Sequence, residues 1–444
     1  MSVIREPARD TQVLGEYDVV VIGGGPAGIT AATAAARTGR SVILIERYGY
    51  LGGAGTAGGL STFCGLHARV HGAHQQVIHG IADDILSRLR SLDGLSEPHL
   101  SLGDKVMAQA FDISAYKIAA DEIVTGSGAT LLYHALVTGV SLSPDGTRID
   151  AVFTESKSGR HAIRGQVFID CSGDGDVAAW SGAAFEKAPE LLFPSLMFRI
   201  AGVDPERAGE AWKTVSRLMD EAEAAGTHTF PRKRPIVRPQ RHPAEWRANM
   251  TQLSNPDGSP VDGTDVWQLT HGELTGRRQI LDAFGFIRSS TPGFEESYIV
   301  DIAPQVGIRE TRRIVGSYQV SESDVLDCGV FEDSIGVNGW PVEAHVAGTV
   351  DIRFHRFGRG VNDLPFRMII PRGVANLYVA GRCASMTQGG QSAARVSGPC
   401  FAMGQAAGTA ADLALKAGVS CGEVEYAQLR ERLVSDGAQL GVPE

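Results

Sequence analysis

The segment Gly23-Gly24-Gly25-Pro26-Ala27-Gly28 constrains the fold of this chain more than any other part of its sequence. It follows an apolar run at residues 17–22, of the kind that forms a strand buried on both faces. It opens an alanine-rich stretch at residues 27–38, which predicts a helix ending at Gly39. Residues 41–45 predict a second buried strand. Strand, glycine turn, helix and strand within about 30 residues make a βαβ unit, so we expect an α/β fold.

A glycine turn in this context is typical of a dinucleotide-binding site. Gly23 permits the tight turn, Gly25 lets the backbone approach a pyrophosphate at the helix N-terminus, and Gly28 lets helix and strand pack closely. Glu46 follows Gly28 by 18 residues, at the end of the second strand. Its carboxylate would accept hydrogen bonds from ribose hydroxyls and repel a 2′-phosphate. NAD and FAD both satisfy these features.

Further glycine-rich segments favour FAD over NAD. Residues 49–55 form a second glycine loop directly after Glu46, which NAD enzymes do not need and which the longer FAD can reach. Residues 167–171 predict a strand that runs into Ser172-Gly173-Asp174-Gly175. Small residues there let the chain pass close to a cofactor.

A third patch lies near the end of the chain, at residues 376–405. It predicts a strand ending at Gly381-Arg382 and a helix over 399–417, with Pro399 at its first position and Gly418 past its end. A helix N-terminus aimed at the flavin ring stabilises negative charge developing there, and Arg382 would add a fixed cation.

The remaining patterns predict two domains. Helices are expected over 75–92 and 112–125, and the strand-like runs 129–133, 136–142, 148–155 and 161–169 indicate a β-meander. A Rossmann-like FAD-binding domain with a central parallel sheet would comprise residues 1–75, 110–183 and 365–444. An α+β substrate domain, 184–364, would be inserted into it, and a helical segment, 76–109, would lie between them.

These patches resemble the FAD-dependent oxidoreductase family of the glutathione-reductase-type superfamily. Residues 294–316 and 364–374 also look like this family's, and the resemblance spans about residues 16–415. Many members of the superfamily carry an acidic residue where Arg382 stands, whereas arginine agrees with the narrower family. Val137 enters only through the resemblance, at a place that offers backbone groups to adenine. The resemblance implies FAD contacts from Gly23, Gly25, Pro26, Ala27, Gly28, Glu46, Arg47, Gly53, Ala54, Thr56, Val137, Ser172, Gly173, Asp174, Gly381, Arg382 and Gly398.

Three residues are candidates for catalysis: Arg382, Arg309 and His67. Arg309 lies near Arg312 and Arg313, after a helix-like stretch at 295–303, and such arginines either bind a substrate carboxylate or form surface ion pairs. His67 begins a loose histidine group with His71, His74 and His79, and one of them is a candidate general base. No acidic ligand accompanies these histidines, so we expect no metal.

Charge and cysteine spacing restrict the class of protein further. The formal net charge of −10 argues against nucleic-acid binding and anionic membranes. No CxxC is present, the six cysteines are scattered, and no apolar segment is membrane-sized, so we expect a cytoplasmic protein. The predicted function is a FAD-dependent dehydrogenase or oxidase that moves hydride from a small organic substrate, anionic if the arginines face the flavin, to flavin N5. A tRNA-modifying flavoprotein and a flavin-binding subunit of a larger redox complex are the alternatives, and a homo-oligomer is possible.

Overall fold

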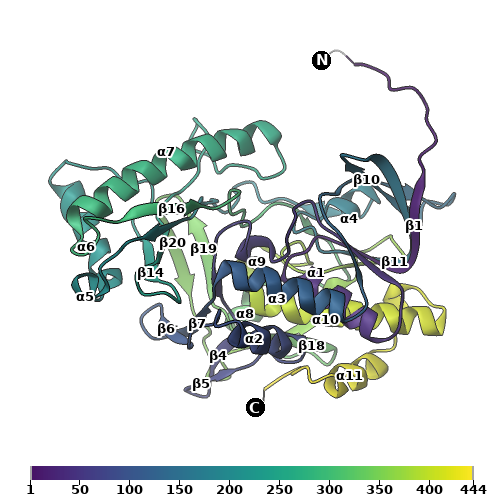
Figure 1. The fold of residues 1–444 in the computed structure, drawn as a ribbon. Helices are drawn as coiled ribbons and strands as arrows, with labels where there is room; N and C mark the ends of the chain where they lie inside the picture. The colour runs from purple at the N-terminus through teal and green to yellow at the C-terminus, as the bar shows by residue number, and fades with distance from the viewer. Residues whose placement is uncertain (1–2, 443–444) are drawn as a thin grey trace.

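A seven-stranded sheet forms the centre of the computed structural model, which describes residues 3–442 (Figure 1). Strands β8, β2, β1 and β11 follow one another and are parallel, and β22 pairs in parallel with the end of β11. Along its first half β11 instead pairs with β10, which pairs with β9, and both pairings are antiparallel. The strands are β1 (Val13–Ile22), β2 (Val42–Ile45), β8 (Thr130–Leu132), β9 (Leu136–Leu142), β10 (Ile149–Ser156), β11 (Gly159–Asp170) and β22 (Leu377–Val379).

Both faces of the parallel strands are covered, as the apolar run in β1 predicts. Val19 and Val21 pack into a core made with the helices, while Val20 and Ile22 pack into a second core under the meander. Adjacent side chains on a strand point to opposite faces, so a doubly buried strand must be apolar throughout. The helices on the first face are α1 (Pro26–Arg37), α2 (Ile81–Ser91), α3 (Ile113–Gly126) and α10 (Ser397–Ala417), and α4 (Asp176–Trp180) lies with the meander.

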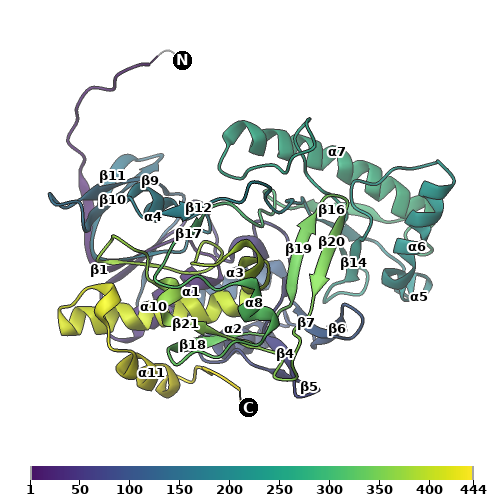
Figure 2. The ribbon, with the colours of Figure 1, turned by 180° about the vertical axis from the view of Figure 1, so that it is seen from behind.

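Two glycines bring α10 against α1, so segments from opposite ends of the chain lie side by side (Figures 1 and 2). A Cβ on Gly404 would lie 2.0 Å from the carbonyl oxygen of Ala27, and one on Gly408 would lie 2.2 Å from that of Ala31. The Thr30 hydroxyl donates across the contact to the Phe401 carbonyl, at 2.9 Å. Only glycine allows the two backbones to come this close.

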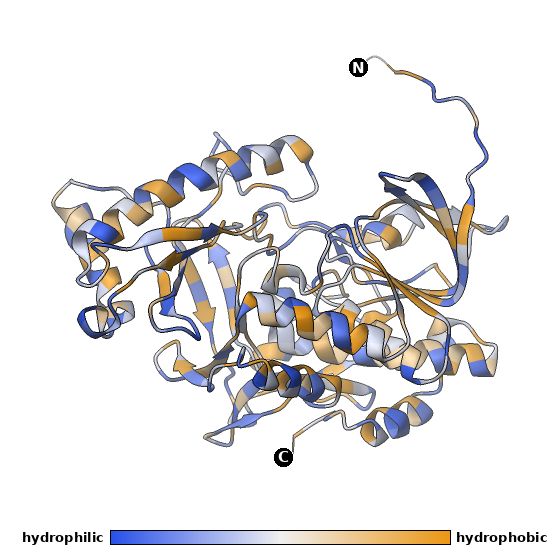
Figure 3. Ribbon diagram, in the orientation of Figure 1, coloured by the Kyte–Doolittle hydropathy of each residue, from blue (hydrophilic) through white to orange (hydrophobic). Residues whose placement is uncertain are grey.

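A third core lies outside the central sheet, and we call the elements around it the second unit. It surrounds a four-stranded antiparallel sheet, in the order β14, β15, β13, β16, and contains buried side chains from Leu196 to Val306. Hydrophilic and hydrophobic turns alternate along its longest helix, α7 (Figure 3). The elements are β13 (Phe198–Ala201), α5 (Pro205–Ala208), α6 (Ala211–Ala224), β14 (Ile236–Pro239), β15 (Trp246–Asn249), α7 (Val266–Ser290) and β16 (Tyr298–Ile302).

Shorter elements complete the fold. They are η1 (Gly53–Gly55), β3 (Thr62–Phe63), β4 (His67–Val70), β5 (Ala73–Gln76), β6 (His99–Ser101), β7 (Val106–Ala110), β12 (Phe185–Glu186), β17 (Arg313–Ile314), α8 (Glu322–Leu326), β18 (Ser334–Asn338), β19 (Val342–Val346), β20 (Thr349–Arg353), β21 (Asn362–Pro365), η2 (Phe366–Ile369), α9 (Gln388–Ala394), η3 (Cys421–Glu423) and α11 (Tyr426–Ser435). No helix within residues 3–442 is long and apolar enough to cross a membrane.

The α/β class, the Rossmann-like parallel sheet, the meander and the α+β second unit are confirmed. The helix-like reading of 295–303 is wrong, because 298–302 is strand β16, paired with β13. The helix predicted over 75–92 begins only at Ile81, since 73–76 pair with β4, and the segment 76–109 also contains β6 and β7. Side chains between residues 320 and 369 pack into the first core, together with the helices of the predicted FAD-binding domain. The predicted limits of the two domains stay a prediction.

Candidate FAD-binding site

The first glycine turn joins β1 to α1 at the carboxyl edge of the parallel strands. Gly23 has φ 95°, and a Cβ there would lie 2.4 Å from the Cys171 carbonyl oxygen. A Cβ on Gly28 would lie 1.8 Å from the Gly23 oxygen, so these two glycines permit close packing. Gly25 differs, because the nearest atom to a Cβ there is the Cα of Gly53, 3.8 Å away. Gly25 is also the N-cap of α1 and supplies no side-chain cap, so the N–H groups of Ala27 and Gly28, which follow Pro26 in the first turn, are available to an anion.

Glu46, directly after β2, braces this turn from the side. Its side chain is 8% exposed, and its two carboxylate oxygens accept hydrogen bonds from the Gly24 N–H (2.7 Å) and the Tyr48 N–H (3.0 Å). A carboxylate has about four lone-pair positions, so it can still accept from the hydroxyls of a ribose. The residue is thereby fixed in orientation before any ligand binds.

The second glycine loop faces the first, backbone against backbone. The Gly52 N–H donates to the Gly24 carbonyl (2.8 Å), and Gly52 has φ 110°, which glycine adopts without strain. A Cβ on Gly53 would lie 2.9 Å from the Cα of Gly25. Because neither loop has side chains at this point, a phosphate group can approach both.

The turn after β11 is organised by a buried carboxyl group. Asp170 accepts hydrogen bonds from the Ser172 hydroxyl (2.6 Å), the Ser172 N–H (3.0 Å) and the Ala178 N–H (2.9 Å). Burial raises the pKa of Asp170 to about 6. The turn then places Gly173, with φ 81°, beside the Arg382 guanidinium.

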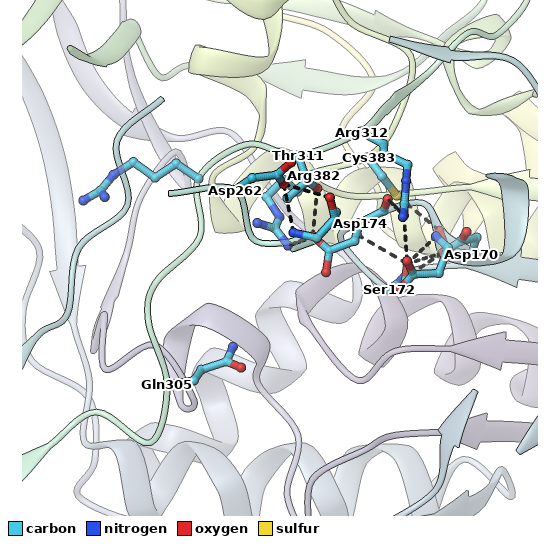
Figure 4. A network of polar contacts seen from close by, with 12 residues as sticks. Asp170, Ser172, Asp174, Asp262, Gln305, Thr311, Arg312, Arg382 and Cys383 are labelled. Carbon is cyan, nitrogen blue, oxygen red and sulfur yellow. Dashed lines mark hydrogen bonds and ion pairs between the residues drawn. The ribbon is translucent and has the colours of Figure 1, made fainter. Parts of the chain in front are cut away.

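Asp174 connects this turn to the end of β22. Its carboxylate accepts from Arg382 Nη2 (2.8 Å) and from the Thr311 hydroxyl (2.7 Å), and its carbonyl accepts from Arg312 Nη1 (3.0 Å). Figure 4 shows Asp174 among these partners, with Gln305 apart from the network. Arg382 Nη1 is buried without a hydrogen-bond partner in the protein. Nη2 of Arg382 is therefore paired with Asp174, and Nη1 remains available to donate a hydrogen bond to a ligand.

Residues from all three glycine patches line one cavity. Its lining includes fourteen of the predicted FAD contacts: Gly23, Gly25, Pro26, Ala27, Glu46, Arg47, Gly53, Ala54, Val137, Ser172, Gly173, Asp174, Gly381 and Arg382. Gly28, Thr56 and Gly398 do not line it. The Thr56 hydroxyl donates to the Leu51 carbonyl (2.7 Å), and a Cβ on Gly398 would lie 2.1 Å from the Gly65 oxygen, so both serve local packing.

Sequence reasoning missed several residues that line the cavity. Arg395, Ser397 and Cys400 lie within the third glycine patch, just before or inside the first turns of α10, and their position next to a predicted helix start was a usable signal. Gln305 comes from the loop after β16, and nothing in its surrounding sequence marks it. Tyr48, Phe63 and Tyr116 add aromatic surface.

The structure gives the three neighbouring arginines separate partners within the protein. Arg309 is 7% exposed and donates to the Phe193 carbonyl (2.7 Å) and the Ser195 hydroxyl (2.8 Å), away from the lining of the cavity. Arg312 pairs with Asp176 (2.7 Å), and Arg313 pairs with Glu310. We therefore expect no direct substrate contact from Arg309.

His67 also lies outside the lining of the cavity. It is in strand β4, and His71 is in the turn to β5, so the helical spacing considered for metal binding does not exist there. Burial, with His74 and His79, lowers the pKa of His67. Within residues 3–442, no three His, Cys, Asp or Glu side chains are grouped so as to hold a metal.

The cysteines form no disulfide, and those nearest the cavity are protonated. All six are free thiols. Cys171 and Cys400 line the cavity, and burial raises the pKa of Cys171 well above its usual value and that of Cys400 to about 12. The thiolate is the reactive form, so neither side chain is a nucleophile or redox partner at neutral pH.

A Rossmann-type sheet whose glycine turns, buried ribose-side carboxylate and C-terminal helix meet at one cavity defines a dinucleotide-binding oxidoreductase. The chain belongs to the FAD-dependent oxidoreductase family, whose model matches residues 18–433. It is an enzyme of that family and a flavoprotein.

Matches to individual proteins are partial. Thiamine thiazole synthase of Methanococcus vannielii is 32% identical over 184 residues, which are 39% of this chain and 62% of that protein. A soluble pyridine nucleotide transhydrogenase of Mycobacterium tuberculosis is 29% identical over 125 residues, 28% of this chain and 26% of that protein. The chain thus spans less than two thirds of the length of these relatives.

A solved structure shares the fold. That of p-nitrophenol 4-monooxygenase PnpA from Pseudomonas putida superposes with a TM-score of 0.51 at 12% identity, and covers 97% of this chain and 90% of its own. This agreement concerns the fold alone.

The residues present fit FAD. The space beside Gly25, the uncapped start of α1 and the facing loop at Gly53 suit a pyrophosphate, and Glu46 suits the adenosine ribose. Arg382, with its buried unpartnered Nη1, would lie toward the flavin, because β22 and β2 are on opposite sides of β1 in the sheet.

Proposed function

We propose that this chain is a dehydrogenase or oxidase that takes a hydride from a small organic molecule. The observation that carries the proposal is the composition of the cavity at the start of α10. Arg382 and Arg395 supply cations there, and Leu60 and Phe63 supply apolar surface. A few convergent polar groups on an apolar lining suit a small-molecule substrate.

The protein groups at this end favour negative charge. Bound FAD supplies the chemistry, because its isoalloxazine ring accepts the two electrons and the hydrogen of a hydride. At the start of α10 the Gly398 N–H donates to the Cys64 carbonyl (2.9 Å) and Pro399 has no N–H, so the backbone donor left for a ligand in this turn is that of Ser397, which lines the cavity. Asp174 holds the Arg382 guanidinium in a fixed orientation through a 2.8 Å ion pair. Fixed donors and a fixed cation stabilise charge that develops during reaction without reorganising.

The organic substrate is the expected electron donor because the chain lacks the parts that a pyridine-nucleotide reductase of this superfamily uses. Its sequence has no second glycine fingerprint after a mid-chain strand, and no CxxC. Gly126-Ser127-Gly128 lacks the third glycine, and Gly173-Asp174-Gly175 belongs to the cavity already described.

The test is an anaerobic screen of the purified yellow protein. Alcohols, amines, amino acids and hydroxy acids are added in turn, and bleaching of the flavin absorbance identifies the class that is oxidised. Heat-released cofactor should be FAD and not FMN. An absence of bleaching with every class, together with salt-sensitive RNA binding or a required partner protein, would replace this proposal with one of the two alternatives.

A further inference from the structure

Three buried arginines and one half-buried arginine lie next to the cavity, and we call Arg232, Arg247, Arg309 and Arg395 the arginine group. Arg232, Arg247 and Arg309 are 2%, 5% and 7% exposed; the first two come from the second unit, and Arg309 lies in the segment that directly follows it. Arg395 follows α9 and lines the cavity. Arg247 Nη1 donates to the carbonyl of Leu60, which also lines it.

Positive charge in this group exceeds the negative charge around it. Arg309 interacts electrostatically with Arg232 and Arg395, and Arg247 interacts with Arg232. Glu343 is the carboxylate that acts on Arg232, Arg309 and Arg395 alike.

The neighbouring groups do not cancel the excess. Glu343 already accepts from Trp340 Nε1 (2.8 Å) and His345 Nε2 (3.2 Å). Glu310, which also acts on Arg395, is paired with Arg313. Burial lowers the pKa of Arg232 and Arg247 to about 10, so both keep their charge at neutral pH.

The arginine group also contains hydrogen-bond donors that the protein leaves unused. Nε of Arg247 and Nε of Arg395 are buried without an acceptor, and so is Nη1 of Arg382, which lies outside the group and lines the same cavity. Buried charges are normally paired and buried donors are normally satisfied, because leaving them alone costs free energy. An anion with oxygen acceptors would both balance the positive charge and accept hydrogen bonds from the unused donors.

We propose that the arginine group is the anion subsite of the cavity, and that the molecule oxidised is a carboxylic acid whose carboxylate binds Arg395. The other three arginines supply the positive potential behind it. The inference rests on the proposed function, since it names the substrate class for the same cavity.

The surroundings favour a carboxylate over a phosphate. Within the arginine group only Arg395 lines the cavity, the nearby Arg382 is already paired with Asp174, and Leu60, Phe63 and Val396 in the same lining are apolar. A single planar guanidinium matches a carboxylate, often by two parallel hydrogen bonds, whereas a dianionic phosphate calls for several donors. An acid with an apolar body therefore fits this end. The hydride would come from a C–H bond on a carbon that bears a hydroxyl or amino group, which loses its own proton to solvent as the carbonyl or imine forms.

Binding of benzoate to the FAD-loaded protein tests the subsite without knowledge of the true substrate. Benzamide has the same shape without the charge, and inorganic phosphate has the charge without the apolar body. Perturbation of the visible flavin spectrum should give a Kd for benzoate at least tenfold lower than for benzamide or phosphate. Equal binding of benzoate and benzamide, or tighter binding of phosphate, would overturn the inference.

Substitutions at Arg395 test whether benzoate binds at this residue. Arg395→Gln should raise the Kd for benzoate at least tenfold. Arg395→Lys keeps the charge but loses the planar guanidinium, so its Kd should lie between those of the parent protein and Arg395→Gln. Arg217→Gln is the matched control, because Arg217 is exposed and pairs with Glu221 on α6. An unchanged Kd in Arg395→Gln with normal flavin content would also overturn the inference. Should that variant fold poorly, the benzoate–benzamide comparison in the parent protein decides.

The two proposals fail separately. If benzoate binds through Arg395 but no organic compound bleaches the flavin, the anion subsite stands and the dehydrogenase or oxidase proposal fails. If a neutral alcohol or amine bleaches the flavin and benzoate does not bind, the redox proposal stands and the carboxylic-acid inference fails.

Discussion

The protein backbone around Gly25 leaves room for a Cβ at this position. A side chain there would instead occupy the space that a pyrophosphate needs. The φ and ψ of Gly25, −72° and −176°, are extended, so strain is not the reason for a glycine there. The space in front of it, bounded by Gly53, is the part of the cavity suited to a pyrophosphate. Gly25→Val should therefore abolish FAD retention while leaving the fold intact, and the ratio of flavin to protein absorbance after purification measures it.

Gly126→Val provides the control for this substitution. Gly126 is the exposed last residue of α3, and a Cβ there meets no atom within 4 Å. This variant should keep its flavin. Full flavin content in Gly25→Val would show that the pyrophosphate does not approach this turn.

Asp170 makes a prediction about pH. Burial raises the pKa of its carboxyl from 3.8 to about 6 in the folded protein, so between these values the folded chain holds a proton that the unfolded chain has released. The contribution of Asp170 to the free energy of unfolding must then fall as pH rises through that interval and stay constant above it. Asp170→Asn should show no such dependence of the unfolding free energy on pH. Its unfolding free energy should also be lower by about 1–3 kcal/mol, because the amide group would face the Ala178 N–H.

Urea unfolding at a series of pH values from about 4 to 8 measures the effect. The difference in unfolding free energy between parent and Asp170→Asn should be largest near pH 4 and smaller above pH 6. Parallel curves would mean that Asp170 is ionised throughout.

On the scale of elements, the contact between α1 and α10 gives a substitution whose sign runs against helix propensity. Alanine is about 1 kcal/mol more favourable than glycine inside a helix. At Gly404, however, the added Cβ would lie 2.0 Å from the Ala27 oxygen. Gly404→Ala should lower the free energy of unfolding by about 1–3 kcal/mol, as overpacking does, and should weaken FAD binding because Ala27 lies in the first turn of α1.

Gly285→Ala is the same change in another helix. Gly285 lies in α7, is exposed, and a Cβ there meets nothing within 4 Å. Thermal unfolding should show this variant at or above the parent and Gly404→Ala below it. Equal melting temperatures for the two variants would contradict the close helix contact.

Elements with a clear periodicity could be predicted from the sequence, and those defined by distant partners could not. The strand 17–22 and the meander have apolar patterns that their own residues determine. Strand β5 exists because it pairs with β4, and the predicted helix overlapped its last two residues because Val77 and Ile78 continue the apolar spacing of α2. In the site, the glycine turns were found because backbone geometry demands that residue type. Gln305 and the arginine group depend on how the second unit packs, which no local pattern encodes.

On the scale of the whole molecule, the single dinucleotide cavity predicts how the flavin is reduced. Residues 3–442 contain one Rossmann-type sheet, and its cavity is the one assigned to FAD. NADH or NADPH should therefore not be the direct reductant. Stopped-flow mixing of the oxidised protein with either nucleotide should leave the flavin absorbance unchanged over seconds. Dithionite, which needs no binding site, is the control and should bleach it.

Fast reduction, at roughly tens per second, would contradict this prediction, because that is an ordinary catalytic rate. The chain would then bind a pyridine nucleotide without a second Rossmann motif. A reductase or monooxygenase would become the better description of its activity.

The packing of α10 on α1 has a consequence for biosynthesis. Domains generally fold as units while the ribosome adds about 5–20 residues per second, starting from the N-terminus. Here the strand that completes the sheet, residues 377–379, and the helix that covers α1, residues 397–417, are made only after the whole core between Leu196 and Val306. The alanine-rich face of α1 therefore stays uncovered while that core is being synthesised. The cavity, which is lined by Arg382 and Cys400, is complete only after α10 has been made.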